Sequence, residues 1–356
     1  MQIAHIEITP VELRLHHPYR AAHHVDHAIE HIPVIFVRIE TRQGEVAWGC
    51  AAFEPQRTGE TLEQVLRACH ACADRAKDLS PLNLEYALDA LVGITAGTPS
   101  AQCAFDMAFH DLLGLATRQP LYRLLGGFRD RIQTSVTVNV GTVNEAVAVA
   151  RERARQGFRI LKLKGGIDPH EDVARVRAVR AALPHHTLRL DADGGYTIQE
   201  ALEVARALED VLEMLEQPVP AADGVTALRE VTERSPVPVW ADESVRHPAA
   251  ALEIAGRHAA HGLSLSLASC GGLRCARQIE AIARAARLAT MVGCINEPAL
   301  LASAGLAFAL SSPGVTYGDL DGHFDLADDP SQPRFTLHEG WLIASESPGL
   351  GCTVEL

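Results

Sequence analysis

The feature that most restricts the fold of this chain is a regular alternation that begins near residue 131. Short apolar runs rich in β-branched residues take turns with Ala-rich segments of amphipathic, helical spacing. The apolar runs cover 134–140, 160–164, 187–193, 212–217, 237–243, 263–268, 289–294 and 315–319, and the helical segments lie near 143–156, 169–183, 197–209, 222–234, 247–259, 271–287 and 298–310. This pattern predicts an α/β fold, a modified (β/α)8 barrel of the TIM type whose eighth helix is missing or displaced.

The residues before about 125 place strands first and helices afterwards, without alternation. Strands are expected over 2–15, 32–41 and 45–53, and helices over 60–78, 83–92 and 99–116. This order predicts an α+β domain. We therefore expect an N-terminal α+β domain over 1–125, a barrel over 126–322 and a C-terminal segment over 323–356. That segment has strand-like stretches at 334–337 and 341–343, and we expect it to return to the N-terminal domain.

Charge and composition exclude several classes of partner. The formal net charge of −13 argues against binding to nucleic acid or to an anionic membrane. No apolar run is long enough to span a bilayer, and the first residues lack the pattern of a signal peptide. The eight cysteines are scattered through apolar runs, so we expect reduced, buried thiols in a cytoplasmic protein.

Two segments carry side chains that could bind a metal, but a structural explanation is preferred for each. Cys69 and Cys72 have a metal-like spacing without a second pair, and their Ala-rich helical surroundings favour core packing. A His-rich segment between the first two strands is interpreted as a mobile loop. Its histidines are His16, His17, His23, His24, His27 and His31.

Two lysines mark the end of the second barrel strand. Lys162 and Lys164 alternate along a strand, so both side chains lie on one face. Neighbouring ammonium groups disfavour each other's charge, which would lower one pKa toward neutrality and make that lysine a general base. The alternative is a solvated edge strand. The apolar neighbours argue against it, as does the use of only three lysines among 32 basic residues.

Carboxylates stand at the ends of the next three strands. Asp191, Glu216 and Asp242 would converge on one point, because a barrel gathers the C-terminal ends of its strands. Each could instead be a helix N-cap, but three in register beside a lysine pair favour a site for a hard divalent cation such as Mg²⁺. Further polar residues at or near strand ends are expected to contact substrate, namely Thr137, Asp193, Glu243, Glu297, Asp319 and Asp321.

These motifs, taken together, resemble the enolase superfamily, in its muconate lactonizing enzyme subgroup. The similarity covers nearly the whole chain and includes Lys162-Leu-Lys164, Asp191-Ala-Asp193, Glu216-Gln-Pro218, Asp242-Glu-Ser244, Gly271-Gly-Leu273 and the helix region 104–127. The resemblance implies that the N-terminal domain caps the barrel and that Asp191, Glu216 and Asp242 hold Mg²⁺. It also implies abstraction of a proton α to a carboxylate, giving an enediolate, with Lys164 as the base and Lys162 lowering its pKa.

The dipeptide epimerases are the most similar group within that subgroup. They carry an Asp-x-Asp motif at the end of strand 8 that binds the α-ammonium of the substrate, and Asp319-Leu-Asp321 matches it. One position departs from the family. A lysine normally ends strand 6, but this chain has Ser266 there. A serine hydroxyl holds its proton too tightly to replace an ammonium efficiently, which weakens the case for two-base epimerisation.

Three functions remain open at this point. The first is an isomerase that epimerises dipeptides or racemises related amino-acid derivatives, with water, Ser266 or a nearby group as a poor second acid. The second is a one-base lyase or cycloisomerase of the same superfamily. The third is a ligand-binding homologue without turnover. We expect a small carboxylate ligand, a dipeptide in the first case, and a homo-oligomeric protein.

Overall fold

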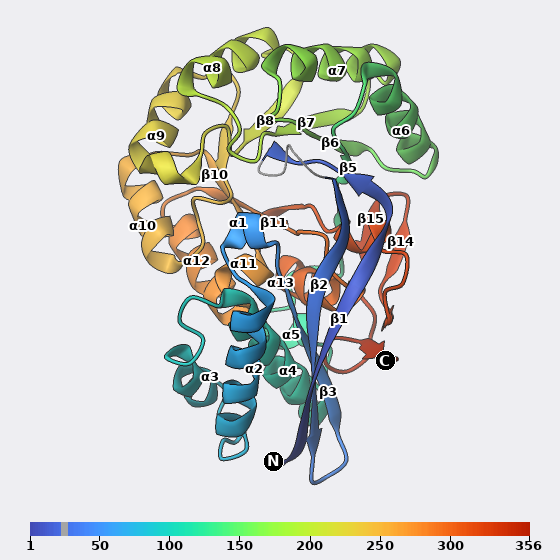
Figure 1. Cartoon of the computed structure of the whole chain (residues 1–356), viewed down its shortest axis with the longest axis vertical. Coiled ribbons are helices and arrows are strands. Elements are labelled where there is room, and N and C mark those ends of the chain that lie inside the picture. The colour runs from blue at the N-terminus through green and yellow to red at the C-terminus, as the bar shows by residue number, and fades with distance from the viewer. Residues whose placement is uncertain (23–27) are drawn as a thin grey trace.

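The computed structural model describes residues 1–22 and 28–356, and it places a smaller domain against one end of a barrel (Figure 1). Eight parallel strands form the barrel in the order β12-β11-β10-β9-β8-β7-β6-β5. A parallel bridge between Thr134 and Gly318 joins the two outer strands and closes the sheet. The strands are β5 (Val136–Val138), β6 (Ile160–Lys164), β7 (Thr187–Asp191), β8 (Leu212–Glu216), β9 (Val239–Ala241), β10 (Gly262–Ser266), β11 (Ala289–Gly293) and β12 (Val315–Gly318).

Seven long helices connect these strands, and most of them cover the outside of the barrel, as the alternation predicts (Figure 1). Several begin at the capping residues that the sequence offers, since the side chains of Thr142, Asp168 and Thr197 accept hydrogen bonds from first-turn amides. The helices are α6 (Val143–Arg155), α7 (Pro169–Ala182), α8 (Ile198–Ala207), α9 (Gly224–Arg234), α10 (Pro248–Arg257), α12 (Leu273–Ala285) and α13 (Ala299–Ser311).

Three short helices among the described residues add to these connections, two of them directly before α9 and α12. They are η2 (Ala221–Asp223), α11 (Leu267–Cys270) and η3 (Gly322–Asp325). The last of them follows β12, at the place where a regular barrel would have its eighth long helix. The expected modification of the barrel is therefore confirmed.

Helix α12 begins at Leu273 rather than at residue 271, and its start is shaped by the other domain. Gly271 and Gly272 have φ values of +92° and +98°, which glycine adopts without strain. A Cβ on Gly272 would lie 2.7 Å from the side chain of Asp106. Asp106 accepts hydrogen bonds from the amides of Leu273 (2.7 Å) and Arg274 (3.1 Å), so this aspartate caps a helix of the barrel domain.

The N-terminal domain is the expected α+β unit. Its three strands form an antiparallel sheet in the order β1-β2-β3, and helix α4 packs on it so closely that a Cβ on Gly49 would lie 1.9 Å from the carbonyl oxygen of Ala104. Its elements are β1 (Ile3–Tyr19), β2 (Ile29–Thr41), β3 (Val46–Ala52), α1 (Pro55–Thr58), α2 (Leu62–Ala76), α3 (Leu84–Val92), α4 (Pro99–Thr117) and α5 (Leu121–Leu124).

The His-rich segment is only partly a loop. His16, His17 and His31 belong to β1 and β2, which extend further than the sequence pattern indicated because antiparallel pairing continues to Tyr19 and Ile29. The interpretation of this segment as a mobile loop also covers His23, His24 and His27, which lie outside the described residues. Cys69 and Cys72 are buried in the core of the N-terminal domain, in agreement with the packing interpretation.

The C-terminal tail returns by a different route from the one expected for its strands. β14 (Thr336–His338) pairs with β15 (Trp341–Ile343), which pairs with β4 (Arg131–Gln133) just before the first barrel strand. β13 (Ser331–Pro333) pairs with β16 (Cys352–Val354). The tail does reach the N-terminal domain through Asp111 of α4, which accepts a hydrogen bond from the Leu350 amide (2.7 Å). No helix among the described residues is long and apolar enough to cross a membrane.

Candidate active site

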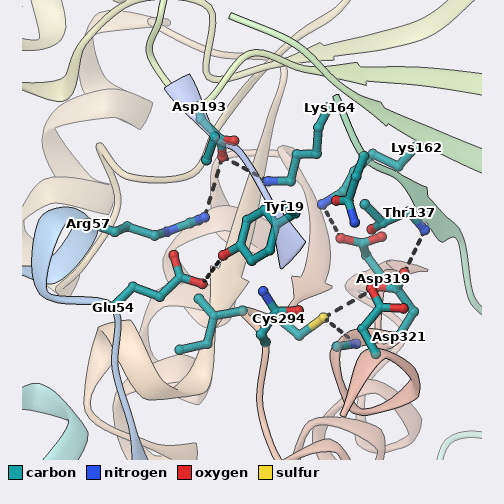
Figure 2. Close-up of a pocket in the computed structure, with 16 residues that line it drawn as sticks. Tyr19, Glu54, Arg57, Thr137, Lys162, Lys164, Asp193, Cys294, Asp319 and Asp321 are labelled. Atoms are coloured by element: carbon teal, nitrogen blue, oxygen red, sulfur yellow. Dashed lines mark hydrogen bonds and ion pairs between the residues drawn. The ribbon is translucent and has the colours of Figure 1, made fainter. Parts of the chain in front are cut away.

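A cavity with about 480 Å³ of empty space lies where the C-terminal ends of the barrel strands meet the N-terminal domain (Figure 2). The N-terminal domain contributes Tyr19, Ala21, Glu54 and Arg57 to its lining. The barrel and the segment after it contribute Thr137, Asn139, Lys162, Lys164, Asp193, Cys294, Ile295, Asn296, Asp319, Asp321, Gly322 and Asp325. The cavity thus contains both lysines and the Asp-x-Asp motif that the sequence singled out.

The two lysines lie on one face of β6, as alternation predicts, and both point into the cavity. Lys164 Nζ lies 2.8 Å from Asp191 Oδ2 and 2.8 Å from Asp193 Oδ1. Lys162 Nζ donates to Asp319 and lies 3.2 Å from Asp191 Oδ2. The pair is therefore neither solvated nor on an edge strand.

The charges around Lys164 do not produce the lowered pKa that we predicted for it. Burial lowers the pKa of this ammonium, but Asp191 and Asp193 raise it by more, and the net direction is upward. Lys162 acts on the pKa of Lys164 in the predicted downward direction, but the two carboxylates outweigh it. A divalent cation bound to Asp191 would neutralise part of the charge of that carboxylate. The carboxylate would then raise the pKa of Lys164 by less.

The three carboxylates proposed as metal ligands are buried at the ends of neighbouring strands. Asp191 is the parallel register partner of both Lys164 and Glu216, and Asp242 lies two residues beyond the partner of Glu216. Each faces a cation of the protein. Asp191 pairs with both lysines, Glu216 Oε2 lies 3.6 Å from Lys162 Nζ, and Asp242 accepts from Arg57.

Glu216 tests whether these residues suit a metal ion. Both of its carboxylate oxygens are buried and accept no hydrogen bond from any described group. Burial and the neighbouring carboxylate of Asp191 raise the pKa of Glu216 well above its usual range. A buried carboxylate without donors next to two more carboxylates is a set of hard oxygen ligands, and such a set fits Mg²⁺.

Arg57 is the main contribution of the N-terminal domain to this acidic cluster, and sequence reasoning did not find it. Its Nη2 donates to Asp242 and lies 3.1 Å from Glu243 Oε1, while Nη1 lies 3.5 Å from Asp193 Oδ1. No periodicity marks this arginine, because it belongs to α1, a helix of four residues. Tyr19 at the end of β1 and Glu54 just before α1 were also missed, and they meet through a 3.0 Å hydrogen bond from the tyrosine hydroxyl.

The two carboxylates of the Asp-x-Asp motif lie in different environments. Asp319 is fully buried and accepts from Lys162 and from Ser135. Asp321 accepts a 2.6 Å hydrogen bond from the backbone amide of Thr137, so Thr137 acts through its main chain. Burial and the nearby Asp319 raise the pKa of Asp321 to about 6. Because Lys162 donates to Asp319, Asp321 is the carboxylate of the motif that is better placed to bind a cation from a ligand.

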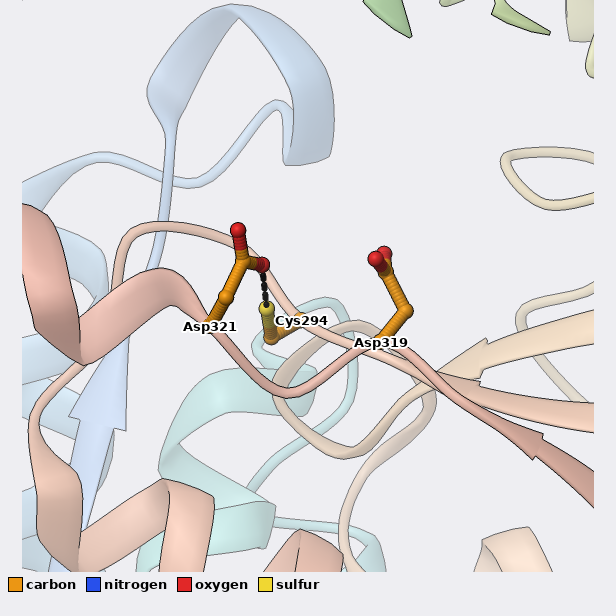
Figure 3. A group of neighbouring side chains, drawn as sticks. All are labelled: Cys294, Asp319 and Asp321. Carbon is orange, nitrogen blue, oxygen red and sulfur yellow. Dashed lines mark hydrogen bonds between the residues drawn. The ribbon is translucent and has the colours of Figure 1, made fainter. Parts of the chain in front are cut away.

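A second cluster, consisting of Cys294, Asp319 and Asp321, lies on the same wall of the cavity (Figure 3). One ligand atom from each of the three lies within 4.8 Å of the others. The Cys294 thiol donates to Asp321 Oδ1 over 3.6 Å, and the Gly322 amide donates to its sulfur over 3.3 Å. A thiol beside carboxylates that already bind Lys162 and Thr137 is less suited to Mg²⁺ than the all-oxygen set on β7, β8 and β9.

The other predicted residues are brought close to the cavity to different degrees. Asp193 lines it, and the largely buried side chain of Glu243 lies beside Arg57, where removal from water raises its pKa to about 8 despite the arginine. Glu297 is buried with its Oε2 accepting from the Ile295 amide at 3.4 Å, and it is not among the lining residues. Ser266 is also buried outside the lining, and its hydroxyl has no hydrogen-bond partner among the described residues.

This fold and site define a class of protein: a capped (β/α)8 barrel with a buried cluster of lysines and carboxylates at the C-terminal ends of its strands. Two family models match the chain. The N-terminal domain of mandelate racemase and muconate lactonizing enzyme matches residues 3–126, and the enolase C-terminal domain-like model matches residues 145–355. The chain therefore belongs to the mandelate racemase and muconate lactonizing enzyme family of the enolase superfamily.

Known members of the family are similar over their full length. The L-Lys-D/L-Arg epimerase of Methylococcus capsulatus is 37% identical, with 99% of each chain covered. A substrate-liganded structure of the L-Ala-D/L-Glu epimerase from Bacillus subtilis has a TM-score of 0.95 at 31% identity and covers 100% of both chains. The dipeptide epimerase from Methylococcus capsulatus, solved with Mg and the dipeptide L-Arg-D-Lys, has a TM-score of 0.90 at 35% identity and also covers 100% of both chains.

Proposed function

We propose that this protein is a Mg²⁺-dependent isomerase that epimerises dipeptides by removing the proton α to a carboxylate. The observation that carries the proposal is that Lys164 and Asp321 line one cavity, while the three carboxylates lie at the strand ends next to it, with Asp191 Oδ2 2.8 Å from Lys164 Nζ. A base, a site for a divalent cation and an acceptor for an α-ammonium are the three elements that such a reaction needs. The similar epimerases, two of them solved with substrate or dipeptide, support the same function.

Each group has a role that follows from its position. Asp191, Glu216 and Asp242 would hold Mg²⁺, which would neutralise negative charge as it grows on the carboxylate of the substrate. Lys164 would take the α-proton, and Lys162, held by Asp319, would keep a second positive charge beside the reacting carboxylate. Asp321 would receive the α-ammonium, Asp193 would form part of the cavity wall, and Glu243 and Glu297 would support that wall from outside the lining.

The charge of the cavity suggests which dipeptides to try first. Five carboxylates line it, from Glu54, Asp193, Asp319, Asp321 and Asp325, against the three cations of Arg57, Lys162 and Lys164. Electrostatic complementarity therefore favours dipeptides with a cationic side chain over those with an acidic one. Two of these carboxylates are already paired with cations of the protein, Asp325 with Arg153 at 3.2 Å and Asp193 with Lys164 at 2.8 Å.

Ser266 supports a second candidate function. Elimination and lactonisation can proceed with one base, so a lyase or cycloisomerase would not need a second lysine at that position. A ligand-binding homologue without turnover would not need one either. The Asp-x-Asp motif favours the epimerase, because it provides a carboxylate for an amino-bearing substrate.

A dipeptide library incubated with the enzyme and Mg²⁺ in D₂O separates these functions. An epimerase incorporates deuterium at one α-carbon, which mass spectrometry detects, and inverts that centre, which chiral chromatography detects. Lys164→Ala should lose at least about 10²-fold in exchange of the epimer whose α-hydrogen faces this lysine. Lys77→Ala, an exposed lysine paired with Asp74, is the control. If dipeptides bind but none of them exchanges its α-hydrogen, the epimerase proposal is contradicted.

Two further proposals concern the protein rather than its site. All eight cysteines are free, and seven of them are buried, which supports a reducing compartment and hence the cytoplasm. We also propose a homo-oligomer, which sedimentation analysis can test.

A further inference from the structure

Inversion at an α-carbon requires a second proton-transfer group on the face opposite Lys164. This requirement rests on the proposed epimerase function. Lys164 ends β6, and in the closed barrel β10 lies four strands away, directly across the axis, while β11 lies beside β10 and three strands from β6. The second group should therefore come from the C-terminal ends of β10 and β11.

Ser266 is the last residue of β10 and Cys294 directly follows β11, and both side chains carry an exchangeable proton. The strands pair in parallel so that Ser266 is the register partner of Gly293, which places Ser266 and Cys294 beside each other at the same end of the barrel. Ser266 is not among the lining residues, and a hydroxyl gives up its proton far less readily than a thiol does. Cys294 lines the cavity, and Figure 2 shows Lys164 and Cys294 on opposite sides of it.

The surroundings of Cys294 suit a proton-transfer group. Among the eight cysteines, all within the described residues, it alone is partly exposed, while the others are buried. The Gly322 amide donates to its sulfur over 3.3 Å and would stabilise a thiolate. The Asp321 carboxylate accepts the thiol proton over 3.6 Å and would fix the direction in which the thiol points (Figure 3).

We propose that Cys294 is a second catalytic residue, which exchanges a proton with the α-carbon on the face opposite Lys164. In one direction Lys164 removes the α-proton, and the Cys294 thiol then donates its proton to the opposite face of the enediolate. The products are the inverted dipeptide, a lysine ammonium and a thiolate. In the other direction the thiolate removes the proton and the ammonium returns one. Proton exchange with water resets both groups, and no oxidant or other reactant is needed.

The resting state of the thiol agrees with the first direction. Burial raises the pKa of Cys294, and the carboxylates of Asp321 and Glu297 raise it further, so the resting sulfur carries its proton. A protonated thiol is a donor, and it becomes a base only after it has given its proton away. The first direction therefore starts with a neutral Lys164 amine and a Cys294 thiol, and the second starts with a Lys164 ammonium and a Cys294 thiolate.

Exchange and inversion in D₂O, followed separately for the two epimers, test this role. The substrate is the dipeptide that gives the fastest exchange in the library, and the variant is Cys294→Ala. We expect inversion to fall by at least about 10²-fold. Exchange of the epimer whose α-hydrogen faces Cys294 should fall equally, while exchange of the epimer facing Lys164 should change by less than about threefold. Cys275→Ala, which removes a buried thiol on α12, is the matched control and should leave both rates unchanged.

A second variant and a chemical modification sharpen the result. Ser266→Lys in the Cys294→Ala background should restore inversion, because the new amine would enter from the same side. Alkylation of the Cys275→Ala variant with iodoacetamide, at an alkaline pH that ionises part of the Cys294 thiol, should stop inversion while leaving the Lys164-dependent exchange, and a bound dipeptide should slow the labelling.

The outcomes distinguish this inference from the function on which it rests. If Cys294→Ala inverts at the parental rate, the cysteine is not the second group. If the parent exchanges only the epimer facing Lys164, the cysteine is again excluded, although proton abstraction from a dipeptide would stand. If the parent exchanges neither epimer of any dipeptide, the proposed function itself fails.

Discussion

Arg57 of the N-terminal domain donates to Asp242 of the barrel, and the same Nη2 atom lies 3.1 Å from Glu243 Oε1. The guanidinium is buried and adds Asp193 Oδ1 at 3.5 Å through its other terminal nitrogen. Three barrel carboxylates thus share one cation from the other domain, and Asp193 is also paired with Lys164. This contact ties the closure of the cavity to the charge balance of the predicted metal site.

Arg57→Leu should destabilise the protein, because it leaves Asp193, Asp242 and Glu243 without their shared cation. Removing one partner of a buried ion pair lowers the free energy of unfolding by about 3 kcal/mol or more. Chemical denaturation in the presence of a chelator, which keeps the protein free of metal, can measure this loss. Mg²⁺ should restore part of the loss by neutralising Asp242. Arg67→Leu, an exposed arginine 3.9 Å from Glu63, is the control and should change the free energy of unfolding by less than about 1 kcal/mol. Equal losses for both variants would contradict the role of Arg57.

Asp242→Asn should abolish Mg²⁺ binding or weaken it severely. The amide removes one of the three negative charges that would hold the ion, while its size and its contact with Arg57 change little. Isothermal titration calorimetry of parent and variant checks this directly. Glu209→Gln, at an exposed site after α8, should bind Mg²⁺ like the parent. An Asp242→Asn variant with parental affinity would remove this residue from the ligand set.

Asp321→Ala should weaken binding of a free dipeptide more than binding of its N-acylated analogue. An α-ammonium in a partly dry pocket needs a carboxylate partner, whereas an acylated nitrogen carries no charge. Binding constants for the two ligands, compared between parent and variant, measure the difference. Losses of the same size for both ligands would show that Asp321 supports the cavity in general and does not bind the ammonium.

Asp111 should make the stability of the protein fall as the pH rises from about 4 to about 7. Burial raises the pKa of this carboxyl to about 7, although the amides of Leu350 and Trp48 donate to it. In that range the folded state keeps a proton that the unfolded chain has lost, so the contribution is complete below about pH 4 and lost above about pH 7.

The difference in unfolding free energy between the parent and Asp111→Asn isolates this effect, since the amide does not titrate. It should decline with rising pH over that interval, by at most about 4 kcal/mol, which corresponds to the difference between a pKa of about 7 and the usual value near 4. A difference that is constant with pH would show that Asp111 is ionised in the folded protein.

The sequence by itself determined the order and type of nearly all the elements. Strand β6 is observed over the predicted residues, and the seven long helices of the barrel lie within three residues of the expected ends. Alternation and helical spacing are local properties, so they can be read without knowing the partners of a segment. The placement of Lys162 and Lys164 on one face, and of the carboxylates at neighbouring strand ends, follows from the same local rules combined with the closure of a barrel.

Only the tertiary structure decided which distant residues meet. The contact of Arg57 with Asp242, the capping of α12 by Asp106, the pairing of β15 with β4 and the position of Cys294 opposite Lys164 join segments far apart along the chain. Such contacts depend on how two domains pack and how a sheet closes, and neither leaves a periodic trace in the sequence. The pKa of Lys164 was misjudged for this reason, because the carboxylates that raise it are gathered by the fold.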